Sequence, residues 1–334
     1  MNIAAPNIAG VSGCGVTGSR VVAHLVGAGL RLAVFDSQPA VARRVAQSHG
    51  VVTVPESADL AATDVVVLCQ PAPHEPTAAE LLRSGVTVVS IADDVTDVER
   101  LLSLHELAVR HSATLVVGAA MSPGFSGLLA RSLASQIPVL EELHVAVHGT
   151  GGPACARQHH TALGDSSQSW HDNEWLERLG GSGRELCWFP EPIGARDCYR
   201  AALPDPMLLH LAFPQVSRVS ARVSATRRDR LTARLPMLTP PHREGDLGAV
   251  RVEARGCDNS GARLTAIMGA SGFAADIAAA TAAAVVLGCI HSPPVPGVHV
   301  VGGESLAALD LLRRSMQFGV KVQEFTGVPH AMNW

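Results

Sequence analysis

Residues 7–18 read NIAGVSGCGVTG, an apolar run that leads into glycines at fixed spacing. The first five residues predict a buried strand, and the apolar segment at 16–26 predicts a helix. Gly13 permits a tight turn, Gly15 lets a ligand approach the backbone, and Gly18 lets the helix pack closely on the strand. The stretch therefore predicts a strand, turn and helix with a phosphate site at the helix N-terminus.

An acidic residue follows at the expected distance. A second strand at 31–35 ends at Asp36, where a carboxylate can accept hydrogen bonds from the adenosine ribose of a dinucleotide. The strand before the glycines and the helix after them make the pattern specific. NAD is the expected cofactor, because the Asp36 charge would repel the 2′-phosphate of NADP. Arg43 and Arg44 keep NADP possible if they reach back.

The pattern of alternating strand and helix continues to residue 118. This predicts an α/β protein whose first domain, residues 1–123, is a Rossmann doubly wound parallel sheet. Further strands are expected at 51–54, 64–70, 86–93 and 114–118, with helices at 39–48, 76–84 and 95–111.

Polar and turn residues follow three of these strands, at the sheet edge where such folds bind ligands. Gln70 and Pro71 follow one strand, Asp93 another, and Ser122 lies in the turn after the last. An ordinary strand exit at Gln70 and helix capping at Asp93 or Asp94 are the alternatives. The expected cofactor contacts are Gly13, Cys14, Gly15, Val16, Gly18, Asp36, Gln70, Pro71, Asp93 and Ser122.

The pattern changes after residue 123. Strictly alternating strands at 143–148, 218–225 and 250–255 predict an α+β substrate and dimerisation domain over 124–265. Residues 164–206 are rich in glycine, proline and charge, which predicts a loop region that could cover a cleft. The alanine-rich helix at 271–290 is expected to return to the first domain, and 291–334 is left unassigned.

Composition restricts the partners. The net charge of -4 gives no reason to expect nucleic acid or an anionic membrane, and a small-molecule substrate and a homodimer are expected. Seven scattered cysteines without paired spacing suggest neither a disulfide framework nor a metal site, and fit a cytoplasmic protein. The N-terminus lacks the basic region of a signal peptide. The apolar stretch at 273–290 carries Asp276, so a packed internal helix is expected.

The chain has a single tyrosine, Tyr199, and its lysine count is equally small, with Lys321 near the C-terminus. The Tyr-x-x-x-Lys pair of short-chain dehydrogenases is absent, because Arg200 to Leu203 follow the tyrosine. Proton transfer must therefore fall to another group or to water. Reduction of an imine relaxes this demand, since an iminium carbon accepts hydride without protonation of an oxygen.

The second domain offers two candidate substrate sites. Gly151 and Gly152 precede a predicted helix and could bind a carboxylate, while His159 or His160 could transfer protons. Metal binding by these adjacent histidines is not expected, because neighbours on a helix do not face one site.

The second site is the segment at 194–200. Here Asp197 and Tyr199 are catalytic candidates, while Arg196 or Arg200 would suit capture of a carboxylate. Interdomain ion pairing is the alternative for either arginine.

The chain resembles the saccharopine dehydrogenase-like family of NAD(P)-binding oxidoreductases. The resemblance rests on the glycines at 13–18, the small-residue turn GAAMSPGFS at 118–126, the segment WFPEPIG at 188–194 and the late alanine-rich helix. It implies an enzyme that forms or splits a secondary amine through an imine. Some members of the family use a lysine for proton transfer, and this chain departs from that pattern.

We therefore expect an NAD(P)-dependent oxidoreductase that transfers hydride to or from a small carboxylated substrate at a carbon–nitrogen bond. Three alternatives remain open: a carbonyl or alcohol dehydrogenase, an enzyme that uses NAD without net redox, and a non-catalytic nicotinamide-binding protein.

Overall fold

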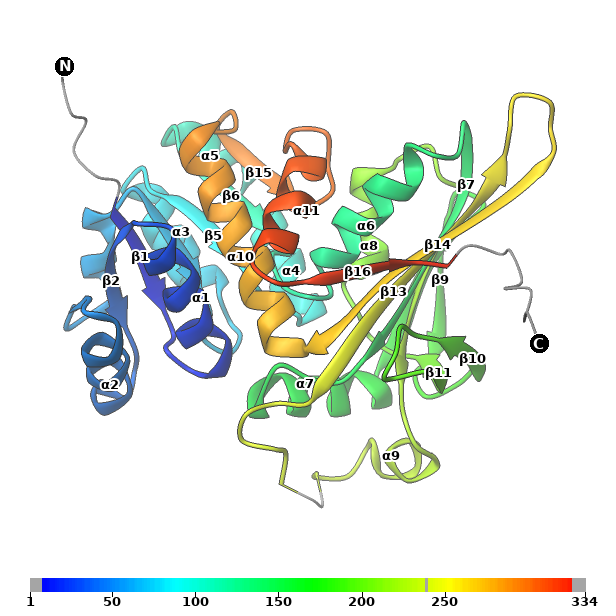
Figure 1. The fold of residues 1–334 in the computed structure, drawn as a ribbon, viewed down its shortest axis with the longest axis horizontal. Coiled ribbons are helices and arrows are strands. Elements are labelled where there is room, and N and C mark those ends of the chain that lie inside the picture. The colour runs from blue at the N-terminus through cyan, green and yellow to red at the C-terminus, as the bar shows by residue number, and fades with distance from the viewer. Residues whose placement is uncertain (1–7, 238–239, 326–334) are drawn as a thin grey trace, which may run out of the picture.

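A computed structural model describes residues 8–237 and 240–325 and contains two β-sheets (Figure 1). Residues 1–7 and 326–334, which belong to the predicted first domain and C-terminal segment, lie outside the described residues. The first sheet has seven parallel strands in the order β15-β6-β5-β4-β1-β2-β3. Its strands are β1 (Ile8–Ser12), β2 (Arg31–Phe35), β3 (Val52–Thr53), β4 (Val65–Leu68), β5 (Thr87–Ser90), β6 (Thr114–Val117) and β15 (Gly297–Val300). The predicted fold class, a Rossmann sheet followed by an α+β domain, is confirmed.

The helices between these strands largely match the prediction. They are α1 (Val16–Gly27), α2 (Pro39–His49), the 3-10 helix η1 (Ser57–Ala62), α3 (Glu75–Arg83), α4 (Val95–Leu102) and α5 (His105–Arg110). The single helix expected at 95–111 is wrong, because the chain turns between α4 and α5. There the Ser103 hydroxyl donates to the Arg100 carbonyl, a local bond that competes with helix continuation.

The glycine turn between β1 and α1 is close-packed. A Cβ on Gly18 would lie 1.8 Å from the Gly13 carbonyl oxygen, and one on Gly13 would lie 2.4 Å from the Gln70 nitrogen. Gly13 also has a φ of 93°, a conformation that favours glycine. Gly15, in contrast, is not closely packed, since no atom lies within 4 Å of its Cβ position. Two of the glycines therefore fix the turn, and the third leaves open space.

The second sheet has nine strands. Seven run in the order β10-β11-β12-β7-β13-β14-β16, and β8 pairs with β12 and β9. The strands are β7 (Val139–His148), β8 (Ser166–His171), β9 (Glu174–Leu179), β10 (Glu185–Trp188), β11 (Ala195–Arg200), β12 (Arg218–Ser224), β13 (Leu247–Cys257), β14 (Arg263–Phe273) and β16 (Lys321–Glu324). Helices α6 (Phe125–Ala134), α7 (Pro153–Gly164), α8 (Asp205–Ala212) and α9 (Arg227–Thr232) accompany them.

The prediction that 164–206 is a loop region is wrong. It forms β8 to β11 and the start of α8. Strand β9 reads EWLERL, and nearly all of its side chains are exposed. It buries no face, so its sequence shows no alternation of apolar and polar residues. Its order comes from backbone pairing with β8, which side-chain hydropathy does not report.

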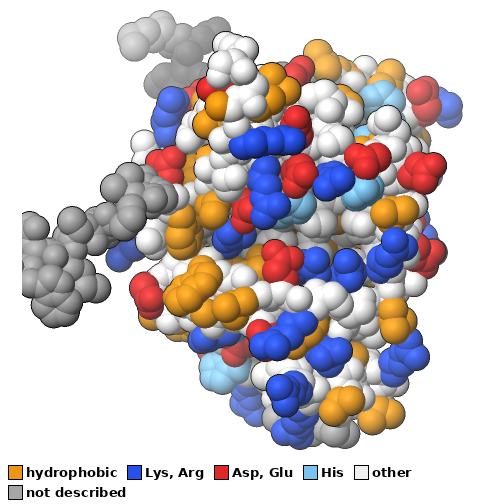
Figure 2. Space-filling model, turned by 90° about the vertical axis from the view of Figure 1, so that its right-hand side faces the viewer, with side chains coloured by type: hydrophobic (Ala, Val, Ile, Leu, Met, Phe, Trp, Pro, Cys, Tyr) orange, Lys and Arg blue, Asp and Glu red, His pale blue; other side chains and the backbone are white. Residues whose placement is uncertain are grey.

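One face of the second sheet carries a set of ion pairs. Leu143, Val145 and Val147 of β7 are buried, while its polar side chains take part in ion pairs on the other face. Arg218 pairs with Glu142, Arg222 with Glu185, and Arg251 and Arg255 with Glu253. Figure 2 shows acidic side chains interleaved with arginines over this end of the molecule.

The alanine-rich segment forms α10 (Ala274–His291), which lies between the two sheets in Figure 1. It packs against α1 and against β4 and β5. Its length and hydropathy would suffice for a membrane span, but 78% of it is buried inside the protein. Asp276 pairs with Arg20 of α1 at 2.5 Å. After α10 the chain adds β15 to the first sheet, forms α11 (Ala308–Gln317) and adds β16 to the second sheet.

Substitution of Gly18 tests the close contact between α1 and the glycine turn. Gly18→Ala is expected to lower the free energy of unfolding by about 1–3 kcal/mol, because the new methyl group overlaps the Gly13 carbonyl. Gly27→Ala is the matched control on the same helix: its Cβ meets nothing within 4 Å, so it should be neutral or stabilising. Urea unfolding of both variants gives the comparison. Equal stability of Gly18→Ala and wild type would show that the turn relaxes freely.

Candidate functional site

The first part of the site is the N-terminus of α1. Gly15 is its N-cap, no side chain caps the helix there, and no acidic residue lies in its first turn. The first amides of a helix lack intrahelical partners and carry partial positive charge. With the open space at Gly15, this end of α1 can accept a phosphate group.

Asp36 lies beside this loop, just after β2. Its Oδ2 accepts a hydrogen bond from the Cys14 amide at 2.7 Å, and its Oδ1 accepts one from the Gln38 amide at 2.8 Å. These bonds fix the carboxylate at the loop. Each oxygen keeps a further lone pair, so the carboxylate can also accept ribose hydroxyls.

Gln70 follows β4 on the other side of the loop. Its side-chain Oε1 is buried and has no hydrogen-bond partner among the residues that the structure describes. A buried acceptor without a partner is costly, which makes it a place for a donor from a ligand. Pro71, the other residue predicted here, is exposed.

His74, which the sequence analysis missed, holds the Gln70 backbone in place. Its Nε2 donates to the Gln70 carbonyl at 2.6 Å, and its Nδ1 lies 2.8 Å from the Ser90 hydroxyl. The backbone amide of His74 donates to Asp97 at 2.7 Å. Burial lowers the pKa of His74, so the neutral ring, which can accept from Ser90, is favoured.

The second domain closes on the glycine turn through the start of α7. The Cβ position of Gly152 lies 3.2 Å from a Val16 methyl, and that of Gly151 lies 3.4 Å from the Thr17 hydroxyl. One turn into α7, the Gln158 amide donates to Asp94 at 2.8 Å. The predicted substrate glycines and the predicted cofactor loop are therefore adjacent.

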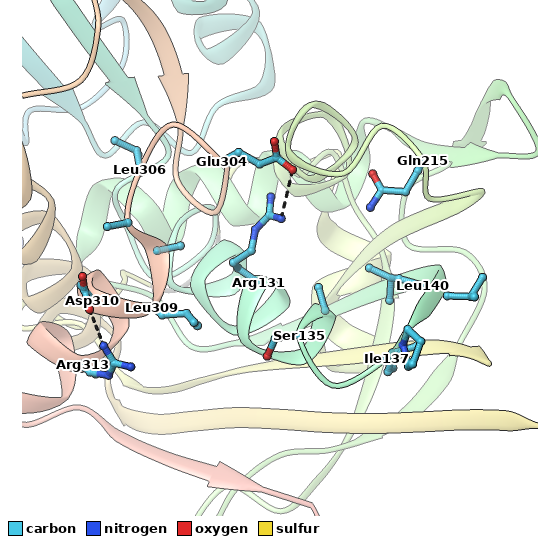
Figure 3. Close-up of a pocket in the computed structure, with 16 residues that line it drawn as sticks. Arg131, Ser135, Ile137, Leu140, Gln215, Glu304, Leu306, Leu309, Asp310 and Arg313 are labelled. Atoms are coloured by element: carbon cyan, nitrogen blue, oxygen red, sulfur yellow. Dashed lines mark hydrogen bonds and ion pairs between the residues drawn. The ribbon is translucent and has the colours of Figure 1, made fainter. Parts of the chain in front are cut away.

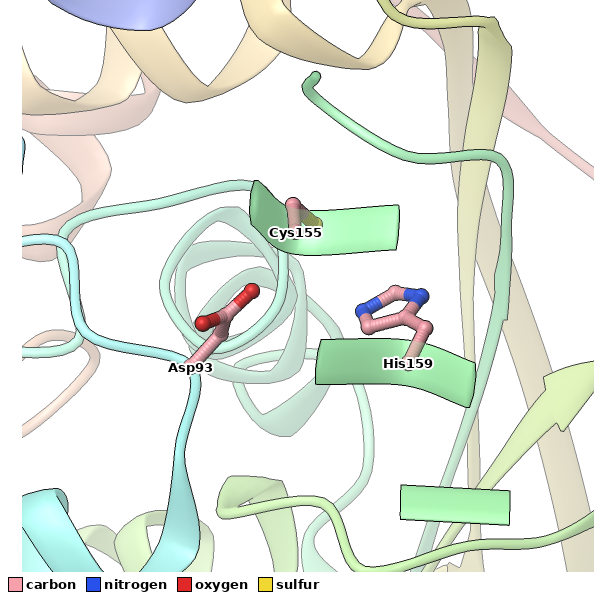
Figure 4. A group of neighbouring side chains, drawn as sticks. All are labelled: Asp93, Cys155 and His159. Atoms are coloured by element: carbon pink, nitrogen blue, oxygen red, sulfur yellow. The ribbon is translucent and has the colours of Figure 1, made fainter. Parts of the chain in front are cut away.

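Asp93, Cys155 and His159 come together beneath this contact (Figure 4). One ligand-type atom from each lies within 4.8 Å of the others. Asp93 follows β5 of the first domain, and the other two lie four residues apart on α7, which places them on one helix face. Burial, then Asp93, raises the pKa of the Cys155 thiol, whereas burial lowers that of His159 and Asp93 opposes this.

Asp93 and His159 were predicted for separate roles, and Cys155 was not among the predicted site residues. The available signal was the Cys-x-x-x-His spacing at 155–159, which the scattered positions of the cysteines obscured.

Two predicted residues have their polar atoms engaged elsewhere. His160, next to His159, turns its ring to the Leu235 carbonyl at 2.8 Å. The Ser122 hydroxyl donates to Asp205 at 2.7 Å, and Ser126 donates to the other oxygen of the same carboxylate at 2.6 Å. The Ser122 hydroxyl therefore ties the Pro-Gly turn to α8, so the expectation of a cofactor contact through it is not supported.

The candidates at 194–200 lie on β11, between β10 and β12 of the second sheet. Asp197 pairs with Arg184 at 3.0 Å, and Tyr199 is 2% exposed beneath the Arg230 guanidinium. Arg196 donates to its neighbour's carbonyl. In the described part of the chain, no hydrogen bond or ion pair joins these residues or Arg200 to Asp93, Cys155 or His159, so the structure does not bring the two predicted sites together.

A hollow of about 850 Å³ lies elsewhere, between α6 and the segment around α11 (Figure 3). Two ion pairs lie along it, Arg131 with Glu304 and Asp310 with Arg313. None of its lining residues belongs to the glycine turn or to the Asp93, Cys155 and His159 group.

No family model and no curated protein sequence matches the chain. Among solved structures, saccharopine dehydrogenase (L-Glu forming) from Saccharomyces cerevisiae is similar, with a TM-score of 0.73 at 14% identity over 96% of this chain and 100% of that one. A meso-dapdh mutant with DAP from Clostridium tetani has a TM-score of 0.50 at 13% identity, covering 88% and 93%. The WlbA dehydrogenase of Bordetella pertussis, in complex with NADH and UDP-GlcNAcA, has a TM-score of 0.47 at 16% identity, covering 96% and 99%. The first of these likenesses shows that the fold is shared along nearly the whole chain.

Asp205 gives a pH-dependent prediction for the turn at Ser122. Burial raises its pKa above the ordinary 3.8, so the folded state binds this proton more tightly than the unfolded chain. That preference stabilises the fold at low pH and is lost as pH rises from 3.8 through the raised pKa. The difference in unfolding free energy, wild type minus Asp205→Asn, should therefore decline as the pH rises from 3.8 to the raised pKa and stay level above it, with a slope of at most about 1.4 kcal/mol per pH unit. Chemical unfolding at several pH values measures it, and a difference that rises with pH would contradict the account.

Proposed function

We propose that the protein is an NAD(P)-dependent oxidoreductase that acts on a small carboxylated substrate at a carbon–nitrogen bond. The observation that carries the proposal is the uncapped α1 N-terminus with open space at Gly15, flanked by Asp36 and the unpartnered Gln70 Oε1. These groups match the parts of a dinucleotide in kind and in order.

The described residues would share the cofactor as follows. The α1 amides at Gly15 and Val16 hold the pyrophosphate, and Asp36 accepts from the adenosine ribose. Gln70 Oε1 accepts from a donor further along the dinucleotide. When bound, the nicotinamide supplies or takes up a hydride. NAD is preferred to NADP because of the Asp36 charge.

The substrate would lie between the domains, next to Asp93 and His159. The N-terminus of α7 has no side-chain cap and no acidic residue in its first turn, so the backbone amides of Gly151 and Gly152, which directly precede the helix, can hold a carboxylate. The fold shared with a saccharopine dehydrogenase supports a carbon–nitrogen bond as the reacting bond.

The place of the lysine also supports this substrate class. Lys321 is an exposed residue of β16, which pairs with β14 in the second sheet, and no hydrogen bond or ion pair joins it to Asp93, Cys155 or His159 among the described residues. A reaction at an imine carbon needs no proton donor for an oxygen at the moment of hydride transfer. The predicted homodimer and the predicted cytoplasmic location are also part of this proposal. The seven cysteines are free thiols, which is consistent with a reducing compartment.

Filling the space at Gly15 should remove cofactor binding. Gly15→Val places a branched side chain where the pyrophosphate would lie, and NADH fluorescence titration should then show no binding. The fold should survive, since the Cβ meets no atom within 4 Å, and thermal unfolding of the variant checks this. Wild-type affinity in a folded Gly15→Val protein would refute the cofactor site.

Removing the charge of Asp36 should change cofactor preference. Asp36→Asn loses charge-assisted hydrogen bonds to the ribose and the repulsion of a 2′-phosphate, so the ratio of NAD to NADP affinity should fall by about 10-fold or more. Calorimetric titration of both cofactors gives the ratio. An unchanged ratio would mean that Asp36 does not contact the ribose and only holds the Cys14 and Gln38 amides.

Turnover with paired substrates tests the reaction class. A 2-oxo acid and an amino acid condense to an imine and water, and a hydride and a proton then give a secondary amine. With NADH present, oxidation measured by absorbance should require both the 2-oxo acid and the amine. Turnover with a carbonyl compound alone would instead indicate a carbonyl reductase, and binding without turnover on any pair would indicate a non-catalytic protein.

A further inference from the structure

The group formed by Asp93, Cys155 and His159 contains three different kinds of metal ligand. A carboxylate oxygen, a thiol sulfur and an imidazole nitrogen lie within 4.8 Å of one another, and Figure 4 shows the three side chains converging from two elements. The Cys155 thiol is hydrogen-bonded to the Asp93 carboxylate and to the Gly151 backbone, so two of the three ligand groups already face each other. His159 is 9% exposed, and Asp93 and Cys155 are half-buried.

We propose that Asp93, Cys155 and His159 bind a divalent transition metal ion, with zinc the best match. Thiolate, imidazole and carboxylate are the ligand types that zinc takes in proteins, at about 2.0–2.3 Å. In a tetrahedral site such bonds place the ligand atoms about 3.3–3.8 Å apart. Separations of up to 4.8 Å exceed this range by at most about 1.0–1.5 Å, a gap that side-chain torsions can close.

Three protein ligands leave one tetrahedral position open. Zinc sites that keep an open position are catalytic, whereas structural sites use four protein ligands. The open position would take the nitrogen or oxygen of the reacting bond where the two domains meet; this part of the inference rests on the proposed function. A cation there would polarise that bond without a lysine.

The metal would also link the two domains. Asp93 comes from the end of β5 and the other two ligands from α7, whose first turn already contacts Val16 and Thr17. Binding of the ion therefore favours the arrangement in which the second domain closes on the glycine turn.

The test uses the full chain and two metal probes. Dialysed protein is titrated with Zn²⁺ alone, and bound metal is measured by mass spectrometry. A parallel titration with Co²⁺ alone follows the near-ultraviolet absorption that only a thiolate bond to cobalt produces. The variants are Cys155→Ser, His159→Asn and Asp93→Asn, and His160→Asn is the matched control, since that ring points to Leu235.

Wild type and His160→Asn should each bind about one Zn²⁺ per chain and show the thiolate absorption with Co²⁺. Loss of even a second-sphere partner weakens metal sites by about 10–100-fold, so each ligand variant should lose about 100-fold or more in affinity, and Cys155→Ser should lose the absorption entirely. Equal metal binding by wild type and Cys155→Ser would overturn the proposal. Wild-type protein that binds no metal would also overturn it, and Asp93, Cys155 and His159 would then be a proton-transfer group.

Titration of NADH into the same samples separates the two claims. Intact NADH binding with no metal would reject the metal site and keep the cofactor site. Metal binding without NADH binding would do the reverse.

Discussion

The contact between Gly18 and the Gly13 carbonyl determines where the rest of the site lies. No Cβ fits at either position, so α1 runs directly against the turn that follows β1. This close approach brings the first amides of α1 to the carboxyl edge of the sheet, between the ends of β2 and β4. Asp36 and Gln70 follow those two strands, which explains why a carboxylate and an unpartnered amide oxygen flank one open space at Gly15.

The second domain packs against the same glycine turn. Gly151 and Gly152 can lie on Val16 and Thr17 because they carry no side chains, and α7 then points Cys155 and His159 toward Asp93. The small side chains of α10 allow a long helix to pack closely against α1. Small residues on three segments thus bring a Rossmann sheet, a mixed sheet and a shared cluster of polar side chains into contact.

The first domain could be predicted from the sequence because buried parallel strands read as continuous apolar runs with glycine and acid residues at fixed spacing. Strands β8 and β9 could not, since their side chains are exposed and only backbone pairing defines them. The same limit applies to the site. Asp93 and His159 could each be recognised separately. Their contact with Cys155 could not, because Asp93 and Cys155 are 62 residues apart in the sequence and belong to different domains. The β11 residues look reactive in sequence and are engaged within their own sheet.

A crystal structure of the protein with bound NADH tests the central claim most directly. The account predicts the pyrophosphate at the Gly15 and Val16 amides, the adenosine ribose at Asp36, and the nicotinamide in the space beside Asp93, Cys155 and His159. A dinucleotide bound in the hollow between α6 and α11, or one whose nicotinamide points away from those three side chains, would contradict it.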